Sequence, residues 1–564
     1  GSCVSENINK HVSRLNRYLP FTAAHEQIFE EFQNADDSLN LDTEALHYTI
    51  KAIRNNARLV ILTGDAGHGK THLCRRLLQD LHGYDENGAR ELINASCDGS
   101  RVIEPPEVAP EKSRLRVFKD FSEIEVDTAA GLLEDAFHEE GVTTVICANE
   151  GRLRAILNSP SHGDACDNIL TSFNNSFYDG LAARDNSVHL INLNFQSVAA
   201  SVEGPSLIDR ALREWTSGTR WRSCEDCESK SLCPLSHNRT LLSNQSDTGL
   251  AESRRKKIEL LFATLERLGI VVTIRDMLMS VAFLLTSGLR CEDVHSRVRR
   301  QREGWQSRFT YYNLLFEMPS NISDEKLRRI PVLREVRRLD PGKIAIRALD
   351  EQIINDQQLF TRGEIDLKFP DLLGSKDEII DAANGVDEIL GNPRNKKERT
   401  READEVLKVV RALRRRAFFD DTDLTPESML RRMGFDGGGL FLSVIRGDMS
   451  NADSARLKRK FIAGLHAIQG LQLGTGEAEL SLVDPAFGNA TSHAAIVADT
   501  IGTKHIQLIP IAAKWELEDN QKEWAISRTV DWIDRHIVLR VTDETDGGSD
   551  LPLDLIQLIC IGLE

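Results

Sequence analysis

The stretch "RLVILTGDAGHGKTHLCRRLLQDLHG", residues 58–83, decides the fold of this chain. Its residues 64–71 match the pattern G-x-x-x-x-G-K-[ST] without a gap. The apolar run 59–62 in front of the pattern is rich in β-branched residues and predicts a buried parallel strand. Leucines at helical spacing follow the pattern until Gly83, which predicts a helix. A strand, a glycine-rich loop and a helix in this order predict a phosphate-binding site rather than a plain turn.

The residue types of this loop suit a nucleoside triphosphate. Glycines let backbone N–H groups point inward at the phosphates, and the helix N-terminus adds partial positive charge. Lys70 is expected to reach the β- and γ-phosphates, and the Thr71 hydroxyl to bind Mg²⁺. We therefore expect ATP and Mg²⁺ as cofactors. The residues expected to bind them are Gly64, Asp65, Ala66, Gly67, His68, Gly69, Lys70, Thr71 and His72.

Length and composition indicate a globular protein of several domains. The chain has 564 residues, of which 41% are hydrophobic and 28% charged. No apolar run approaches membrane-spanning length and no secretory signal precedes the first helix, so we expect a cytoplasmic protein without membrane contact. Ten cysteines do not make a dense disulfide framework, which agrees with a reducing compartment. The net charge of −17 argues against a chain that coats nucleic acid with its whole surface.

Four further strands are predicted after the loop, at 91–96, 115–121, 142–148 and 188–193, with helical patterns between the later ones. Alternating strands and helices predict an α/β fold with a doubly wound, parallel, five-stranded P-loop sheet. A helical lid and then helical and α+β C-terminal modules are expected to follow. The predicted ranges are a helical lead-in at 1–50, an ATPase core at 51–200, a cysteine-rich insertion and lid at 201–290, a charged helical region at 291–430 and an α+β module at 431–564.

Residues 50–200 resemble the AAA+ and STAND nucleotidases in the order and spacing of these elements. In "RVFKDFSEI", the resemblance makes Asp120 the Walker B carboxylate of the Mg²⁺ shell, and Glu123 the residue that polarises the attacking water. The usual Asp-Glu pair is absent. In "TTVICANEGRLRAIL", Asn149 takes the place of the sensor-1 residue. Arg184 takes the place of an arginine finger, which stabilises charge on the phosphoryl group bound to a neighbouring subunit.

A second assignment of the strands stays open. "VICANE" can itself be a degenerate Walker B strand, with Glu150 as the catalytic carboxylate. The strand at 115–121 would then be an edge strand, and Asn192 or Asn194 would be the sensor. Asp120 would in that case be a solvated residue at a strand end.

A cysteine cluster follows the predicted sheet. "WRSCEDCESKSLCPLSHNRTLL" contains Cys224-x₂-Cys227-x₅-Cys233-x₃-His237, a set that can close a tetrahedral, structural zinc site. The second candidate is a [4Fe–4S] cluster with Cys291 as a fourth thiolate. Three unrelated free thiols are the remaining alternative.

The segment "RKKIELLFATLERLGIVVTIRDMLMSVAFLLTSGL" predicts two helices that are split by Gly269. This arrangement resembles the helical lid of AAA+ proteins. The resemblance makes Arg275, at the start of the second helix, a sensor-2 residue for the γ-phosphate. A surface arginine at a helix start is the alternative.

The C-terminal half is charged and mostly helical up to about residue 420. Its arginine groups, among them Arg414, Arg415 and Arg416, can hold a phosphate backbone or form solvated helix faces. "HAAIVADTIGTKHIQLIPI" predicts a hairpin and "HIVLRVTD" a further strand. From about residue 440 onward the sequence has no paired carboxylates, nuclease-like lysine pattern or nucleophile elbow at catalytic spacing.

The motifs "GDAGHGKTH", "FKDFSE", "ANEGRLR" and "TIRDML", with the Cys-x₂-Cys-x₅-Cys-Pro insertion, together resemble the ATPase components of bacterial DNA-phosphorothioation-dependent restriction systems and related anti-phage ATPases. The resemblance implies an oligomeric ATPase that works with other subunits of a defence complex. It also implies contact with DNA, directly or through a partner, and DNA cleavage by another subunit. A nucleotide-binding scaffold or sensor with weak hydrolysis is the alternative function.

Overall fold

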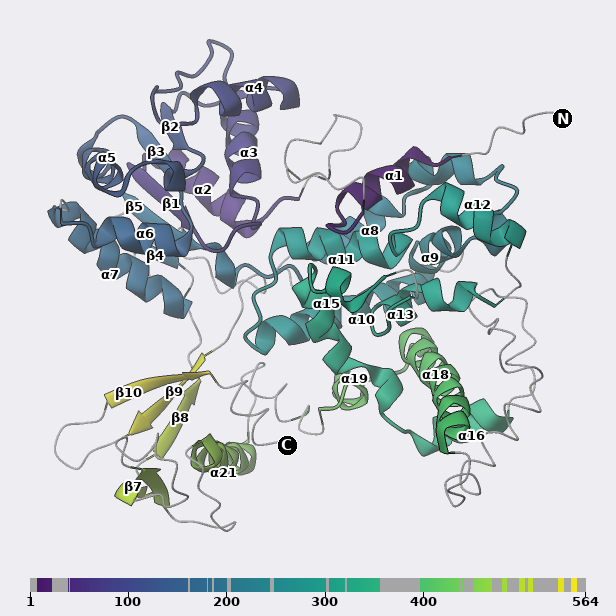
Figure 1. Cartoon of the computed structure of the whole chain (residues 1–564). Helices are drawn as coiled ribbons and strands as arrows, with labels where there is room; N and C mark the ends of the chain where they lie inside the picture. The colour runs from purple at the N-terminus through teal and green to yellow at the C-terminus, as the bar shows by residue number, and fades with distance from the viewer. Residues whose placement is uncertain are drawn as a thin grey trace.

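The computed structural model describes most of the first 355 residues and separate parts of the remainder (Figure 1). The described residues are 8–22, 39, 41–160, 163–179, 181–184, 187–199, 204–243, 248–300, 304–319, 322–355, 396–435, 439, 450–468, 479–483, 497–502, 506–510, 536–541 and 549–554. Residues 1–7, 23–38 and 40 of the predicted helical lead-in lie outside this set.

The first part of the chain is an α/β unit built on one sheet with the strand order β2-β3-β1-β5-β4. Four of these strands are parallel: β1 (Leu59–Thr63), β2 (Leu115–Phe118), β3 (Thr143–Cys147) and β5 (Val188–Asn192). The fifth, β4 (Leu181–Arg184), pairs antiparallel with β5 at the sheet edge. The prediction of five parallel strands is therefore wrong: four of the predicted strands form the parallel part of the sheet, and the fifth strand is the antiparallel β4, which the sequence analysis does not predict.

Helices cover both faces of this sheet, as a doubly wound fold requires (Figure 1). Side chains of a strand alternate between faces, and β1 follows this rule. Val60 and Leu62 share a core with α2 (Glu44–Arg54), α3 (Lys70–His82) and α4 (Glu86–Ser96). Leu59 and Ile61 share another core with α5 (Val126–His138), α6 (Glu150–Leu157) and α7 (Asp164–Asp179). The sheet is thus buried between two helical layers.

The predicted strand at 91–96 is wrong, because these residues end helix α4. The Asp85 side chain accepts a hydrogen bond from the backbone N–H of Gly88 at 2.7 Å and so caps the helix start. Ala89 and Ile93, four residues apart, are the buried face of α4. The apolar pair at 92–93 does not by itself distinguish a strand from a helix, whereas the Asp85 cap and the spacing of Ala89 and Ile93 do.

A second, all-helical body follows the sheet and shares one large core. Gly269, at φ +83°, separates two of its helices, as the sequence predicted. The helices of this body are α1 (Lys10–Arg17), α8 (Leu207–Trp215), α9 (Pro234–Leu242), α10 (Thr248–Arg267), α11 (Ile274–Thr286), α12 (Cys291–Arg300), α13 (Tyr311–Leu314), α14 (Asp324–Leu327), α15 (Pro331–Val336), α16 (Arg347–Asn355), α18 (Lys396–Asp420) and α19 (Pro426–Arg432). Among the described residues, no helix is both long and apolar enough to cross a bilayer.

The N-terminal helix α1 belongs to this helical body. Asn16 donates from Nδ2 to the carbonyl oxygen of Leu289 at 3.0 Å, and its Oδ1 accepts from the Thr286 hydroxyl at 3.1 Å. Both partners lie at the C-terminal end of α11. The N-terminal residues are therefore fixed beside the segment that joins α11 to α12.

The described C-terminal part contains α21 (Asn451–Ile468) and two small antiparallel sheets. In one, β6 (Glu479–Val483) pairs with β7 (Val497–Gly502). In the other, β9 (His536–Val541) lies between β8 (Ile506–Pro510) and β10 (Ser549–Asp554). The predicted hairpin is wrong, because β7 and β8 each pair with a different strand. The predicted strand in "HIVLRVTD" is confirmed as β9.

Two arginines of the group at 411–416 form ion pairs within the helical body. Arg415 is 1% exposed and binds Asp340, which is 2% exposed, with nitrogen–oxygen distances of 2.6 and 2.8 Å. It also contacts Glu317 at 3.1 Å. Arg414 binds both carboxylate oxygens of Asp350 at 2.7 and 2.8 Å. These pairs join α18 to α16 and to the turn at residues 340–342, so the hypothesis that Arg414 and Arg415 form a DNA-binding face is wrong.

We expect Arg415→Ala to lower the free energy of unfolding by about 3–5 kcal/mol, because it leaves the buried Asp340 carboxylate without its cation. Arg347→Ala is the control, since the Arg347 side chain is 90% exposed and its pair with Glu351 contributes little. Urea denaturation followed by tryptophan fluorescence measures both. Equal effects of the two variants would contradict the role given to Arg415.

Candidate nucleotide-binding site

The loop between β1 and α3 has the backbone that the sequence pattern requires. Gly64, Gly67 and Gly69 have φ angles of +122°, +97° and +74°. Residues with a Cβ atom rarely adopt these angles, so glycine is needed at each position. The chain leaves the buried strand at Thr63, curves through the loop and enters α3 at Lys70. The N–H groups that begin α3 therefore face the loop.

The Lys70 ammonium lies inside the curve of this loop. Its Nζ donates to the carbonyl oxygens of Gly64 at 2.9 Å and Asp65 at 2.8 Å. An ammonium in this position has its charge at the centre of the loop, where phosphate oxygens can take the place of the two carbonyl groups.

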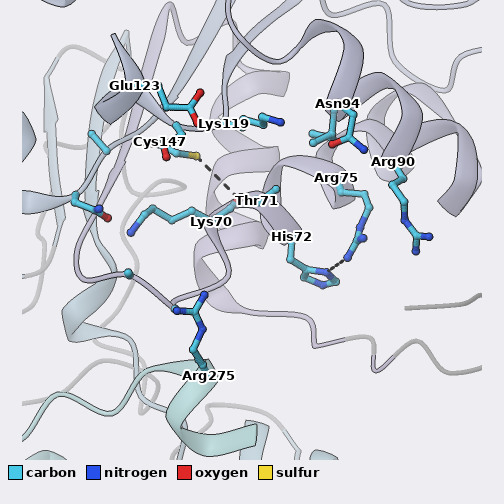
Figure 2. A pocket seen from close by; sticks show the side chains of 16 residues that line it. Lys70, Thr71, His72, Arg75, Arg90, Asn94, Lys119, Glu123, Cys147 and Arg275 are labelled. Atoms are coloured by element: carbon cyan, nitrogen blue, oxygen red, sulfur yellow. Dashed lines mark hydrogen bonds between the residues drawn. The ribbon is translucent and has the colours of Figure 1, made fainter. Parts of the chain in front are cut away.

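A pocket of about 490 Å³ opens beside the loop (Figure 2). Its walls come from the loop, from α3 and α4, from the ends of β2 and β3, and from the start of α11. The lining residues are Ala66, Gly67, Lys70, Thr71, His72, Arg75, Arg90, Ile93, Asn94, Lys119, Asp120, Glu123, Cys147, Ala148, Asn149 and Arg275. The fold thus brings together nine of the residues that the sequence predicts for the nucleotide site.

The pocket is basic although the whole chain is acidic. Five cationic side chains line it, against the carboxylates of Asp120 and Glu123: Lys70, Arg75, Arg90, Lys119 and Arg275. The N-terminus of α3 adds partial positive charge at the same place. The local charge suits a polyphosphate.

Asp120 and Glu123 lie just after β2, at its carboxyl end, and both are exposed to the pocket. The carboxylate of Asp120 also caps a short 3-10 helix (Phe121–Glu123), where it accepts hydrogen bonds from the N–H and the hydroxyl of Ser122. Carboxylate and hydroxyl oxygens are ligands that Mg²⁺ accepts. Asp120 and Thr71 therefore fit a magnesium site in their chemistry.

The two candidate carboxylates of the alternative strand assignments have different surroundings. Asn149 follows β3 and lines the pocket, next to Ala148. Glu150 begins α6, where it pairs with Arg154 at 3.7 Å, and it is not one of the lining residues. This geometry favours Asp120. The edge position of β2 agrees with the second assignment. The first assignment counts a strand at 91–96, and these residues are helical. Both assignments therefore stay predictions.

Asn194, which has no role in the first assignment, binds two residues of the loop through its side chain. Its Oδ1 accepts from the backbone N–H of Asp65 at 2.8 Å and lies 2.9 Å from Nε2 of His68. It follows β5, the neighbour of β1, so the sheet positions it next to the loop. Its role in the second assignment, as a sensor, was the only sequence signal for it.

The start of α11 forms the opposite wall. The backbone N–H of Arg275 donates to the carbonyl oxygen of Gly67 at 3.0 Å. Thr273 and Asp276 form a capping box, in which each side chain binds the other residue's backbone N–H. Figure 2 shows the Arg275 side chain approaching the loop from this helix. Its position agrees with the predicted contact to a γ-phosphate.

His72 is a neutral part of the pocket wall. Burial, aided by the charge of Arg75, lowers the pKa of His72 to about 3. The imidazole is therefore uncharged at neutral pH, and its Nδ1 lies 2.7 Å from Nη2 of Arg75 (Figure 2). This contact fixes Arg75 along the pocket wall. The sequence analysis does not identify Arg75, Arg90, Asn94 and Lys119; Arg90 and Asn94 lie on α4, where the sequence pattern predicts a strand.

Arg184 lies away from the pocket. It pairs through its backbone with Val188, the first residue of β5. The loop follows the carboxyl end of β1, which runs parallel to β5, so Arg184 is at the other end of the sheet. An arginine finger acts on a neighbouring subunit, and this role stays a prediction.

The predicted zinc ligands lie in the helical body, away from the loop. Cys224 ends a 3-10 helix (Gly218–Cys224), Cys233 precedes α9, and His237 lies in α9 one turn later. No three His, Cys, Asp or Glu side chains among the described residues form a group that could hold a metal ion. The Cys₃His zinc site stays a prediction.

Comparison with protein-family models, with curated proteins and with solved structures finds no match to this chain.

We expect Gly67→Ala to weaken nucleotide binding at least about tenfold, equal to about 1.4 kcal/mol. A Cβ at Gly67 would lie 3.0 Å from Cβ of Arg275 and 3.1 Å from Oγ1 of Thr273, so α11 has to move away from the loop. Gly141→Ala is the control, because Gly141 also has positive φ, at +75°, but no atom lies within 4 Å of its added Cβ. Titration with a fluorescent ATP analogue measures the affinity. The interpretation fails if both variants bind like the parent chain.

Proposed function

We propose that the chain binds ATP with Mg²⁺ at residues 64–71 and hydrolyses it. The observation that best supports this proposal is the Lys70 ammonium, held by the carbonyl oxygens of Gly64 and Asp65 at the head of a basic pocket. A glycine-rich loop with three positive φ angles between a buried strand and a helix is typical of phosphate-binding sites.

Each pocket residue takes a defined part in this proposal. Lys70 binds the β- and γ-phosphates, while Thr71 and Asp120 hold Mg²⁺, which neutralises phosphate charge. Glu123 accepts a proton from the attacking water. The water oxygen bonds to the γ-phosphorus while the bond from this phosphorus to the bridging oxygen breaks and ADP leaves. Asn149 orients this water, and Arg275 contacts the γ-phosphate from the helical body. Arg184 would complete the site of a neighbouring subunit in an oligomer.

A nucleotide-binding scaffold or sensor with weak hydrolysis is the second candidate. Two observations favour it: the Asp120 carboxylate already accepts two hydrogen bonds from Ser122, and no acidic residue directly follows Asp120 in the chain. A carboxylate engaged in this way is a weaker ligand for Mg²⁺. The nucleotide would then act by joining the loop to α11 rather than by its turnover.

The wider function rests on the family resemblance of the motifs. We propose that this ATPase works in a bacterial DNA restriction or anti-phage complex, with other subunits as partners and without nuclease activity of its own. The ion pairs of Arg414 and Arg415 inside the helical body favour DNA contact through other residues or through a partner.

Lys70→Ala is expected to lower ATP affinity by about 10- to 100-fold and to abolish turnover, because it removes charge-assisted hydrogen bonds to the phosphates. Lys51→Ala, on the exposed face of α2, is the control. Phosphate release with and without DNA measures turnover, and an ATPase motor should be stimulated severalfold by DNA. Normal hydrolysis by the Lys70 variant would rule out the nucleotide site. ATP binding without measurable phosphate release by the parent chain would support the scaffold.

Asp120→Asn and Glu150→Gln distinguish the two strand assignments. We expect the Asp120 variant to need about 10- to 100-fold more Mg²⁺ for ATP binding, because a carboxylate leaves the metal shell. The Glu150 variant should keep the parent's Mg²⁺ dependence, because Glu150 pairs with Arg154 outside the pocket lining. Mg²⁺ titrations at fixed ATP provide the measurement. The opposite pattern would establish Glu150 as the metal-binding carboxylate.

A further inference from the structure

One side-chain oxygen, Oδ1 of Asn194, joins two separate parts of the phosphate loop. It accepts from the backbone N–H of Asp65 at 2.8 Å and lies 2.9 Å from Nε2 of His68. A backbone N–H is always a donor, so the atom of the amide that faces Asp65 is the oxygen and not the nitrogen. Nε2 of His68 therefore carries a hydrogen and donates it to the same oxygen.

The bond to Asp65 fixes the orientation of the peptide group between Gly64 and Asp65. None of the described peptide bonds is cis, so the carbonyl and the N–H of this group point in opposite directions. The N–H points to Asn194, and the Gly64 carbonyl oxygen on the other side accepts from Nζ of Lys70 at 2.9 Å. A single rigid peptide group thus connects the Asn194 amide with the Lys70 ammonium.

Asn194 approaches the loop so closely that glycine is required at position 64. A Cβ at Gly64 would lie 3.1 Å from both Oδ1 and the backbone nitrogen of Asn194, and 3.3 Å from the backbone nitrogen of Leu193. Two of these three atoms belong to the backbone of a short 3-10 helix (Leu193–Phe195), which does not yield like the end of a flexible side chain. The close approach keeps the Asn194 amide within hydrogen-bonding distance of the loop.

Buried contacts on both sides hold Asn194 in this place. Asn192, the last residue of β5, is 1% exposed and accepts from the N–H of Asn194 through its side chain at 3.1 Å. Further along the chain, Glu266 of α10 accepts from the hydroxyl of Ser197 at 2.5 Å and from the N–H of Val198 at 2.8 Å. The segment that carries Asn194 is therefore fixed both to the sheet and to the helical body.

The Asn194 side chain acts on the backbone of the loop and is not part of the pocket lining, whereas Lys70 and Asn149 are. We propose that Asn194 is a positioning residue: with His68, it orients the peptide group between Gly64 and Asp65 and so holds Lys70 in place for the phosphates of ATP. This proposal rests on the proposed ATP site. The effect of Asn194 reaches the nucleotide through Lys70, in contrast to a sensor, which contacts the γ-phosphate or the attacking water.

A loop that is ordered before the nucleotide arrives lowers the cost of binding. Without the Asn194 oxygen, the N–H of Asp65 and Nε2 of His68 lose an acceptor that they share, and the loop has to be ordered during binding. Once bound, the phosphates themselves accept from Lys70 and restore its position. The contact therefore increases the affinity for the nucleotide more than the rate of the chemical step.

Amide hydrogen exchange in the nucleotide-free full chain tests the contact itself. In Asn194→Ala, the Asp65 amide should exchange at least about fivefold faster than in the parent, while the amides of β1 and β5 keep their rates. Asn158→Ala, an exposed asparagine at the end of α6, is the matched control and should exchange like the parent at Asp65. Exchange of Asp65 at the parent's rate in Asn194→Ala would overturn the proposal.

Affinity and turnover together distinguish a positioning residue from a sensor. We expect Asn194→Ala to bind ATP about 5- to 100-fold more weakly, while its turnover at saturating ATP stays within about threefold of the parent's. Lost turnover at the parent's affinity would make Asn194 a sensor and overturn the proposal. A parent chain that binds no ATP would refute the proposed nucleotide site, whereas exchange at Asp65 still measures the contact.

Two His68 variants test whether the bonds to the Asn194 oxygen act as one unit. His68→Leu removes the donor and should weaken ATP binding at least about fivefold. His68→Gln places an amide N–H near the position of Nε2 and should recover most of this loss. The double variant Asn194→Ala, His68→Leu should lose no more affinity than Asn194→Ala, because both changes remove the same bond. Equal binding by the Leu and Gln variants, or losses that multiply in the double variant, would overturn the proposal.

Discussion

The hydrogen bond from the N–H of Arg275 to the carbonyl oxygen of Gly67 is the contact on which the candidate site depends. It joins the loop of the sheet unit to the first turn of α11, the helix at the centre of the helical body. Only glycine permits it, because at φ +97° any side chain is strained and a Cβ would press against Arg275 and Thr273. The pocket therefore has two walls from distant parts of the sequence, and its shape follows the position of α11.

The parts of the fold that the sequence predicted are those whose evidence is local. The loop, β1 and α3 follow from a contiguous pattern, and β3 and β5 from short runs of buried residues. The errors concern pairing and caps. Helix α4 was taken for a strand because its start depends on one side chain, Asp85. The pairing of β7 with β6, and of β8 with β9, depends on contacts between residues far apart in sequence, which alternation of apolar residues does not encode.

The candidate site was predicted to a similar extent and for the same reason. Thr71 and Arg275 were identified from motifs, and the structure brings both to one pocket with Asp120 and Asn149, although their roles remain proposals. Arg90 and Asn94 of α4 were not predicted as pocket residues, because the sequence pattern of their segment predicts a strand. The same limit applies to the cysteines. Spacing along the chain predicts His237 or Cys291 as a fourth ligand beside the three cysteines, whereas the contacts of Asn9 with Cys224 and Cys291 join residues that lie far apart in the sequence.

The ion pairs of Arg414 and Arg415 show why position in the sequence alone does not predict which charges reach the surface. Arg414 and Arg415 stand in a run of basic residues that suits a phosphate backbone, yet their carboxylate partners lie 64 and 75 residues earlier in the chain. Since Arg415 and Asp340 are both buried, these charges neutralise each other inside the fold and add nothing to the surface potential. Among the described residues, five cations and two carboxylates line the candidate nucleotide pocket. In a chain of net charge −17, this concentration of cations at one pocket favours a small polyanion as the ligand.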